Sequence, residues 1–165
     1  QNHTEGADRE TNTSCKRGVR GDKMALFFED IDIGSEIPTL LKITSTQQLV
    51  RWAGAVDNYD EIHFDKDVAL ARKLPGVIIQ GALKNAFLGQ LMTDWIGVEG
   101  TLKKLSCQHR GMDLPGDTLT CKGKVTNKYV KDSEHLVECE IWVENSKGER
   151  TAPGAATVAL PSRGR

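Results

Sequence analysis

The segment 57–65 concentrates polar side chains just after an apolar stretch of the chain. Its one imidazole, His63, follows Asp60 by three residues, Asn58 by five and Asp57 by six. A carboxylate and an imidazole that hold one water between them can move protons to and from a bound molecule. An amide such as that of Asn58 can hold the water by hydrogen bonds, but it cannot take a proton from it as a carboxylate does. The segment therefore indicates acid–base chemistry centred on His63.

Gly81 is the second candidate, because a long apolar helix is expected to begin there. The first turn of a helix carries backbone N–H groups without intrahelical partners, and the helix dipole favours negative charge at the same end. A glycine lets a ligand oxygen approach such a donor closely. Close packing of the helix on a sheet would also require glycine, and the two roles are compatible. Gln80 immediately precedes Gly81, and both are candidates for binding the substrate at this helix start.

The elements that must position these residues follow from periodicity and turn chemistry. Apolar residues predict a helix over 81–96 that is apolar around much of its circumference, and Gly97 ends it. A second helix follows a hydroxyl capping pattern at 44–48, and a short third one is expected at 67–73. Four strands are expected at 101–109, 117–129, 134–145 and 151–160, after a short β-favouring run at 40–43. This order predicts an α+β fold in which an antiparallel sheet wraps around the 81–96 helix.

The two motifs, together with the segment 110–117, resemble the MaoC-like (R)-specific enoyl-CoA hydratases and dehydratases. That family reads A-G-x-S-G-D-x-N-P-I-H-x-D in the first motif and H-G-M/A-L at the start of the central helix. The resemblance extends over about residues 28–161 and implies the hot-dog fold, with the sheet wrapped around a long central helix.

The resemblance assigns roles residue by residue and also exposes two departures. The family's catalytic histidine falls on His63, and its catalytic aspartate falls on Asn58. The family's H-G pair falls on Gln80-Gly81, where Gly81 would offer its amide to the thioester oxygen. Asp57 is the preferred replacement for the lost aspartate and Asp60 the second choice; without either, the chain would be catalytically weak or silent.

The implied reaction adds or removes water across the 2,3 bond of an enoyl or 3-hydroxyacyl thioester of coenzyme A or acyl carrier protein, with (R) stereochemistry. No cofactor and no metal is expected, and the thioester carrier is part of the substrate. The expected assembly is a homodimer or a higher hot-dog oligomer. One alternative is a non-catalytic or weakly active subunit that shapes the acyl pocket of a heteromeric dehydratase with a second MaoC-like chain. A hot-dog thioesterase is less favoured, because the predicted central helix carries no acid before Asp94.

Composition excludes several other classes of function. With 22 basic and 23 acidic residues the formal net charge is −1, which provides no field to hold nucleic acid or an anionic membrane. The four cysteines, at 15, 107, 121 and 139, form no C-x-x-C pair, and the last three are expected to be small buried hydrophobes in strands. No apolar run approaches twenty residues, so a cytoplasmic protein is expected.

The remaining expectations concern the chain ends and individual side chains. Residues 1–23 are expected to be an unstructured leader added before a natural start at Met24, and residues 24–165 to form one MaoC-like domain. His109 and His135 are expected to be surface or packing residues in strands. Lys84 and Arg110 are candidates for contacting a phosphate of coenzyme A.

Overall fold

The computed structural model describes residues 25–164, so the predicted leader, Met24 and Cys15 lie outside the described residues. Two short 3-10 helices, three α-helices and five strands follow one another in the described part. In chain order they are η1 (Phe28–Asp30), β1 (Glu36–Ile43), α1 (Thr46–Val56), η2 (Glu61–His63), α2 (Lys66–Ala71), α3 (Gly81–Ile96), β2 (Thr101–Cys107), β3 (Thr118–Lys131), β4 (Glu134–Glu144) and β5 (Arg150–Leu160).

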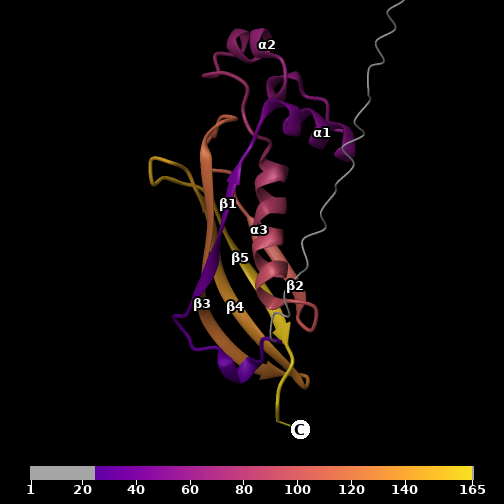
Figure 1. Ribbon diagram of the computed structural model, residues 1–165, viewed down its shortest axis with the longest axis vertical. Helices are drawn as coiled ribbons and strands as arrows, with labels where there is room; N and C mark the ends of the chain where they lie inside the picture. The colour runs from indigo at the N-terminus through magenta and orange to yellow at the C-terminus, as the bar shows by residue number, and fades with distance from the viewer. Residues whose placement is uncertain (1–24, 165) are drawn as a thin grey trace, which may run out of the picture.

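The five strands form one antiparallel sheet in the order β1-β3-β4-β5-β2. The sheet curves along the length of α3, and α1 and α2 gather at the end where α3 begins (Figure 1). The expected α+β architecture, a sheet wrapped around one long helix, is confirmed and is the hot-dog fold. Within residues 25–164, no helix is both long and apolar enough to cross a membrane.

The core lies between α3 and the inner face of the sheet. Phe87, Leu91 and Met92 of α3 are buried against residues of the sheet such as Ile141 and Val158. Each fully buried side chain of this size contributes about 1.5–3 kcal/mol by leaving water. Apolar residues on several sides of α3 must be covered, and the sheet curves around the helix to cover them. The loop before Gly81 is held close to this core because it leads directly into α3.

The helix bounds agree closely with the sequence expectation, and the strand bounds differ from it by one to four residues, with the differences at β1 and β2 the most informative. The 81–96 helix is confirmed, and Gly97 caps it with a positive φ of 67°. β1 begins at Glu36, earlier than expected, although it contains Pro38. It tolerates the proline because it is an edge strand with a break in register between Ile37 and Leu40. β2 ends at Cys107, so the expectation that His109 lies in a strand is wrong.

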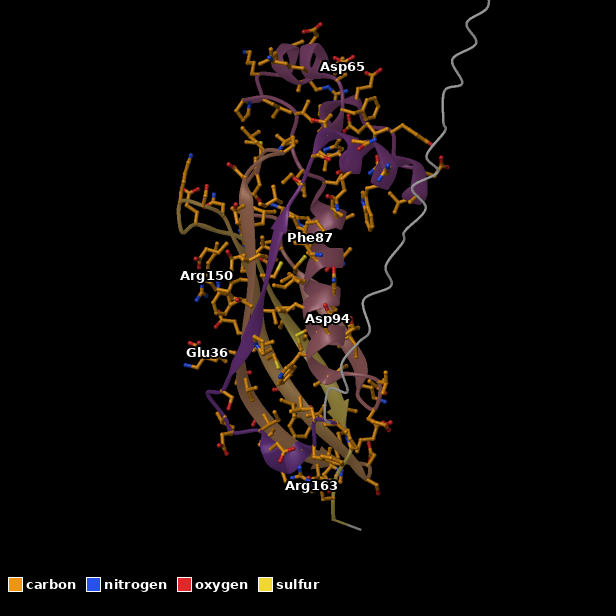
Figure 2. The ribbon with its side chains drawn as sticks, in the orientation of Figure 1. Glu36, Asp65, Phe87, Asp94, Arg150 and Arg163 are labelled. Carbon is orange, nitrogen blue, oxygen red and sulfur yellow. The ribbon has the colours of Figure 1, made fainter. Side chains whose placement is uncertain are left out.

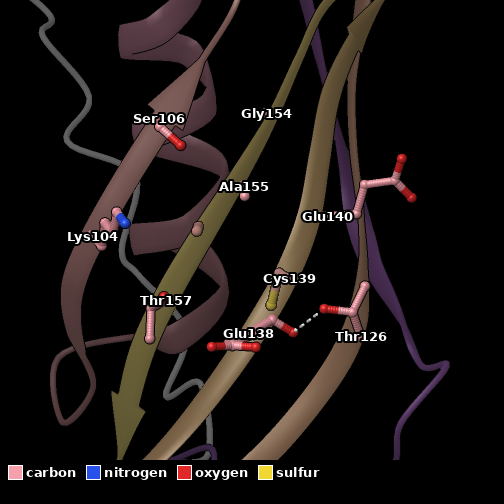
Figure 3. A pocket seen from close by; sticks show the side chains of 10 residues that line it. Lys104, Ser106, Thr126, Glu138, Cys139, Glu140, Gly154, Ala155 and Thr157 are labelled. Atoms are coloured by element: carbon pink, nitrogen blue, oxygen red, sulfur yellow. Dashed lines mark hydrogen bonds between the residues drawn. The ribbon is translucent and has the colours of Figure 1, made fainter.

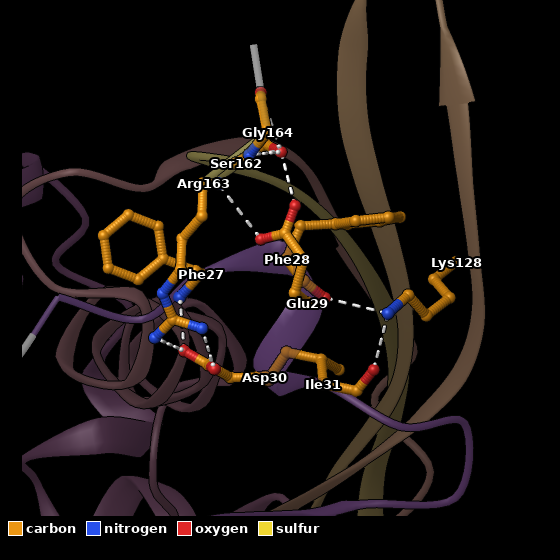
Figure 4. A network of polar contacts seen from close by, with 9 residues as sticks. All are labelled: Phe27, Phe28, Glu29, Asp30, Ile31, Lys128, Ser162, Arg163 and Gly164. Carbon is orange, nitrogen blue, oxygen red and sulfur yellow. Dashed lines mark hydrogen bonds and ion pairs between the residues drawn. The ribbon is translucent and has the colours of Figure 1, made fainter.

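A polar cluster joins the two ends of the described chain at the end of the sheet away from α1 and α2 (Figures 1 and 4). Glu29 accepts hydrogen bonds from the Ser162 hydroxyl and the Arg163 amide, and Asp30 pairs with the Arg163 guanidinium. Lys128 donates to the carbonyl oxygens of Phe28 and Ile31, at 2.8 Å and 2.7 Å. These contacts hold η1 against β3 and the C-terminal residues, far from the His63 loop.

Candidate active site

The His63 loop starts with a left-handed residue at the end of α1. Asp57 caps the helix with φ 53° and ψ 40°, a conformation that aspartate tolerates better than most residues. The amides of Asp57 and Asn58 both donate to the carbonyl oxygen of Ala53. The Oδ1 atom of Asn58 then accepts from the Asp60 amide at 3.4 Å, and the His63 amide donates to the Asp60 carbonyl oxygen at 3.1 Å. These local bonds turn the chain so that η2 presents His63.

The imidazole of His63 is held by the segment just before α3. Its Nδ1 atom lies 2.8 Å from the carbonyl oxygen of Ile78, and the Ile78 amide donates to the Ile62 carbonyl oxygen at 3.2 Å. Because a carbonyl oxygen only accepts, Nδ1 carries the proton in this bond. The Nε2 atom of the neutral ring then has a free lone pair, and it makes no hydrogen bond within residues 25–164. The ring is thus fixed in the tautomer that can accept a proton at Nε2.

The acids of the loop lie near His63 in sequence, but in the described residues neither carboxylate bonds to its ring. Asp60 pairs with Arg72, with 3.1 Å between Oδ1 and Nη1, and both side chains are exposed. Asp57 is exposed at the end of α1. The structure therefore brings His63, Asn58, Asp57 and Asp60 into one loop, and the roles expected of them remain predictions.

Gln80 is the N-cap residue of α3 and Gly81 is its first residue. Gln80 is buried; its Nε2 atom donates to the Leu49 carbonyl oxygen at 2.9 Å, which ties α1 to α3. Its Oε1 atom is also buried and has no partner. The amides of Gly81 and Ala82 donate to nothing among residues 25–164. The start of α3 thus carries the free donors that an oxygen anion requires, three residues after the Ile78 carbonyl that holds His63.

A buried ion pair lies beneath this helix start. The ammonium of Lys84 is 2.8 Å from Asp113 Oδ2 and donates to the Gly111 carbonyl oxygen at 2.8 Å. The Thr151 hydroxyl donates to the same carboxylate oxygen at 2.7 Å, while Asp113 Oδ1 is buried without a partner. The Asp113 carbonyl oxygen accepts from the Ile79 amide at 2.8 Å, so the pair is joined to the segment that holds His63.

This burial overturns one expectation from the sequence. Lys84 is 2% exposed, so the expectation that it contacts a phosphate of coenzyme A is wrong. Its long side chain crosses the core to reach Asp113, a contact between residues 29 positions apart that periodicity could not reveal. Arg110 is exposed and bonds to Gln108 Oε1 through its guanidinium, at 3.0 Å from Nε.

His109 lies against the start of α3, a relationship that the sequence did not reveal. A Cβ atom built at Gly81 would lie only 2.7–2.8 Å from the Cδ2, Cγ and Nε2 atoms of the His109 ring. A side chain at position 81 would therefore collide with this ring unless the ring moved, so glycine allows the close packing seen here. His135, in contrast, packs on Phe28 with 5.0 Å between ring centroids, as expected of a packing residue.

Two other features lie away from this site. A groove on the sheet face opposite α3 is lined by residues of β2 to β5, including Lys104, Ser106 and Glu138 (Figure 3). It contains none of the candidate residues. Asp94 lies near the C-terminal end of α3, whereas Asp65 lies beyond the N-terminal end of this helix (Figure 2). The one acid of α3 is therefore remote from Gly81, which argues against the thioesterase alternative.

Comparison with known structures finds the same fold in two (R)-hydratases. The chain is similar to the (R)-hydratase from A. caviae involved in PHA biosynthesis, with a TM-score of 0.73, 18% identity, and coverage of 81% of this chain and 99% of that one. It is also similar to the R-hydratase PhaJ1 from Pseudomonas aeruginosa, with a TM-score of 0.76, 17% identity, and coverage of 84% and 88%.

The sequence comparisons identify the family. Residues 31–146, more than half of the chain, match the model of the MaoC like domain. The chain therefore belongs to the MaoC-like dehydratase family. It is 24% identical, over 79% of its length and 96% of the relative's, to the beta subunit of 3-oxo-4,17-pregnadiene-20-carboxyl-CoA hydratase of Mycobacterium tuberculosis. It is also similar to a chain of the ChsH1–ChsH2 complex from the same organism, with a TM-score of 0.69, 21% identity, and coverage of 78% and 98%.

Proposed function

We propose that this chain adds water to, or removes it from, the 2,3 bond of an enoyl or 3-hydroxyacyl thioester, in the (R) configuration. Coenzyme A or acyl carrier protein would carry the acyl group. Membership of the MaoC-like family supports the reaction class. The observation that carries the proposal is the bond from His63 Nδ1 to the Ile78 carbonyl oxygen, because it leaves Nε2 free to act as a base and ties the ring to the segment that leads into the free amide of Gly81.

In the hydration direction, His63 Nε2 takes a proton from water while the water oxygen bonds to C3. The electrons of the 2,3 double bond move toward C2 and the thioester oxygen, which gains negative charge. The Gly81 amide donates a hydrogen bond to that oxygen, and charge stabilisation of this kind is often a large part of catalysis. C2 then receives the proton held by the imidazole, so the product has gained one water.

The remaining loop residues would assist the base. Asn58 would hold the attacking water through its amide, since it cannot itself accept the proton. Asp57 is the acid that we expect to help, because the carboxylate of Asp60 is paired with Arg72. Gln80 would support the site through its link to α1. His63 carries the proton in this scheme, with help from Asp57, and we propose no cofactor.

We also propose that the active form is a homodimer or a higher oligomer. β2 is an edge strand, and an unpaired strand edge is suited to pairing with another copy. The relatives named above include a complex of two chains, which agrees with assembly in this family.

A direct assay tests the proposed reaction. The purified protein is mixed with a panel of trans-2-enoyl-coenzyme A thioesters, and loss of the ultraviolet absorbance of the conjugated thioester is followed. We expect turnover on at least one chain length, with a 3-(R)-hydroxyacyl product identified by chiral chromatography. Absence of turnover across the panel by a folded protein would contradict a self-sufficient hydratase.

A second candidate function is favoured by Asn58. A chain without the family's aspartate could shape the acyl pocket of a heteromeric hydratase instead of performing the chemistry alone. The relative from Mycobacterium tuberculosis is itself named as a beta subunit. Here the isolated chain would be inactive on every thioester, and activity would appear on adding a second MaoC-like chain that has both the aspartate and the histidine.

A further inference from the structure

The ring of His109 and the first residue of α3 are in direct contact. A Cβ atom at Gly81 would lie 2.7 Å from Cδ2 and 2.8 Å from Nε2 of this ring, well inside van der Waals distance. The ring therefore covers Gly81 on the side where any other residue would carry its side chain. Because Gly81 begins the helix, the imidazole lies beside the free amides of the first turn.

The backbone around His109 is held firmly by β5. The Gln108 amide donates to the Pro153 carbonyl oxygen at 2.8 Å, and the Arg110 amide donates to the Thr151 carbonyl oxygen at 2.9 Å. His109 is thus placed by the main chain on both sides, just beyond the end of β2. The contact with Gly81 is a consequence of the fold itself.

The polar atoms of this corner are unused within the described residues. Neither ring nitrogen of His109 makes a hydrogen bond there, and the side chain is exposed. The neighbouring Gln80 Oε1 is buried and without a partner. Lys84 and Asp113 lie nearby as a buried ion pair. Because each charge is neutralised by the other, neither is free to bind a ligand in place of His109. A buried acceptor without a partner requires a donor, so Gln80 Oε1 fits a water or an N–H or O–H group of a ligand.

We propose that His109 is a catalytic residue: its imidazole donates a hydrogen bond to the thioester oxygen that the Gly81 amide also binds. A neutral imidazole always carries one N–H donor, so this role requires no change of protonation. His109 stabilises the charge that develops on the oxygen as water adds to C3, and it transfers no proton. The inference rests on the proposed function and adds a second donor to the same oxygen.

His109→Phe is the variant that separates catalysis from packing, because phenylalanine keeps an aromatic ring on Gly81 and removes the N–H donor. We expect kcat to fall on the order of 10²-fold, as for loss of one oxyanion donor, with a much smaller change in KM. His135→Phe is the matched control: it changes a histidine that packs on Phe28 at the opposite end, and it should leave kcat unchanged. A His109→Phe variant with the wild-type kcat would overturn the role of His109 and leave the hydratase intact.

If the wild type shows no turnover, the proposed hydratase activity is overturned. A binding measurement then still tests the role of His109. Octanoyl-coenzyme A has the thioester oxygen but no 2,3 double bond, so it can bind without reacting. We expect it to shift the ring C–H resonances of His109 in the NMR spectrum, which are assigned by their loss in His109→Phe. Saturating octanoyl-coenzyme A that leaves these resonances unmoved would overturn the role of His109.

Discussion

The Nδ1 atom of His63 lies 2.8 Å from the carbonyl oxygen of Ile78, and Ile78 comes three residues before the first residue of α3. One short segment therefore orients the imidazole at one end and supplies the free helix amide at the other. The proposed base and the proposed oxygen-binding donor are therefore linked, because a displacement of Ile78 would shift both. We expect changes to the loop to affect the rate of the reaction more than folding.

Replacing Asn58 by aspartate should increase activity. The carboxylate retains an oxygen that can accept from the Asp60 amide, as Asn58 Oδ1 does at 3.4 Å, so the loop conformation is preserved. The new group can also accept a proton from water, which the amide cannot. We expect kcat of Asn58→Asp to rise by about 10–10²-fold, within the usual range for one acid–base group, in the enoyl thioester assay.

Asn58→Leu is the matched variant in the opposite direction, because leucine has a similar size and no hydrogen-bonding groups. We expect its kcat to fall, because leucine cannot form hydrogen bonds to the water that we propose Asn58 holds. Wild-type kcat in both variants would show that position 58 takes no part in the reaction.

The buried pair of Lys84 and Asp113 makes an unusual stability prediction. Asp113→Ala leaves the ammonium of Lys84 buried without a carboxylate, and breaking a buried pair in this way typically costs about 3–5 kcal/mol. The double variant Lys84→Met, Asp113→Leu removes both charges, so we expect its free energy of unfolding to lie much closer to that of the wild type. Urea unfolding followed by circular dichroism measures both.

Asp60→Ala is the control for this comparison, because it breaks an ion pair of similar length at the surface. The Asp60 and Arg72 side chains are 40% and 55% exposed, so the expected loss is below about 1 kcal/mol. Equal losses for Asp113→Ala and Asp60→Ala would contradict the importance of burial for the Lys84 pair.

Glu29 should give the protein a measurable dependence on acid. Hydrogen bonds, first from the Ser162 hydroxyl and then from backbone amides, lower the pKa of Glu29 from 4.5 to about 2. A carboxyl group whose pKa is lower in the folded state stabilises the fold above pH 4.5, and this contribution is lost as the pH falls toward 2. We expect the urea midpoint of the wild type to fall across this range, and that of Glu29→Gln to fall less.

Glu99→Gln serves as the comparison, because Glu99 is exposed and makes no hydrogen bond within residues 25–164. Its midpoint should follow the wild-type curve. If the urea midpoint of Glu29→Gln falls with pH as that of the wild type does, the hydrogen bonds to the Glu29 carboxylate at η1 do not form in solution.

The buried cysteines should be chemically silent in the folded protein. Burial raises the pKa of the thiols of Cys121 and Cys139 to about 12 in each case. Since only the thiolate reacts, we expect neither residue to be alkylated by iodoacetamide at roughly pH 8 in native buffer, and both to be alkylated in urea. Peptide mass spectrometry measures both states, and native alkylation of Cys121 would show that the sheet opens there.

The sequence predicts the central helix well because local signals agree there. The apolar pattern and the glycines at 81 and 97 mark both ends of α3, and the structure has the same bounds. β1 was harder to predict, because Pro38 is a poor strand residue unless it lies on an edge, and the edge is set by pairing with the distant β3.

The candidate site could be predicted only where side-chain type and spacing carry the information. His63 and Gly81 are identified in this way. The contact of His109 with Gly81 and the pair of Lys84 with Asp113 depend on packing between α3 and chain segments beyond β2. The periodicity of the sequence does not reveal such contacts. A lysine on the apolar face of the predicted helix did indicate, however, that the lysine would need a buried acid as a partner.

The most direct test of the central claim compares His63→Gln with the wild type and with His135→Gln in the enoyl thioester assay. Glutamine keeps a donor that can reach a carbonyl oxygen but has no basic nitrogen to accept a proton. We expect kcat of His63→Gln to fall on the order of 10²–10⁴-fold while the protein remains folded, and His135→Gln to retain the wild-type rate. A wild type that turns over and a folded His63→Gln with the same kcat would contradict the assignment of His63 as the base.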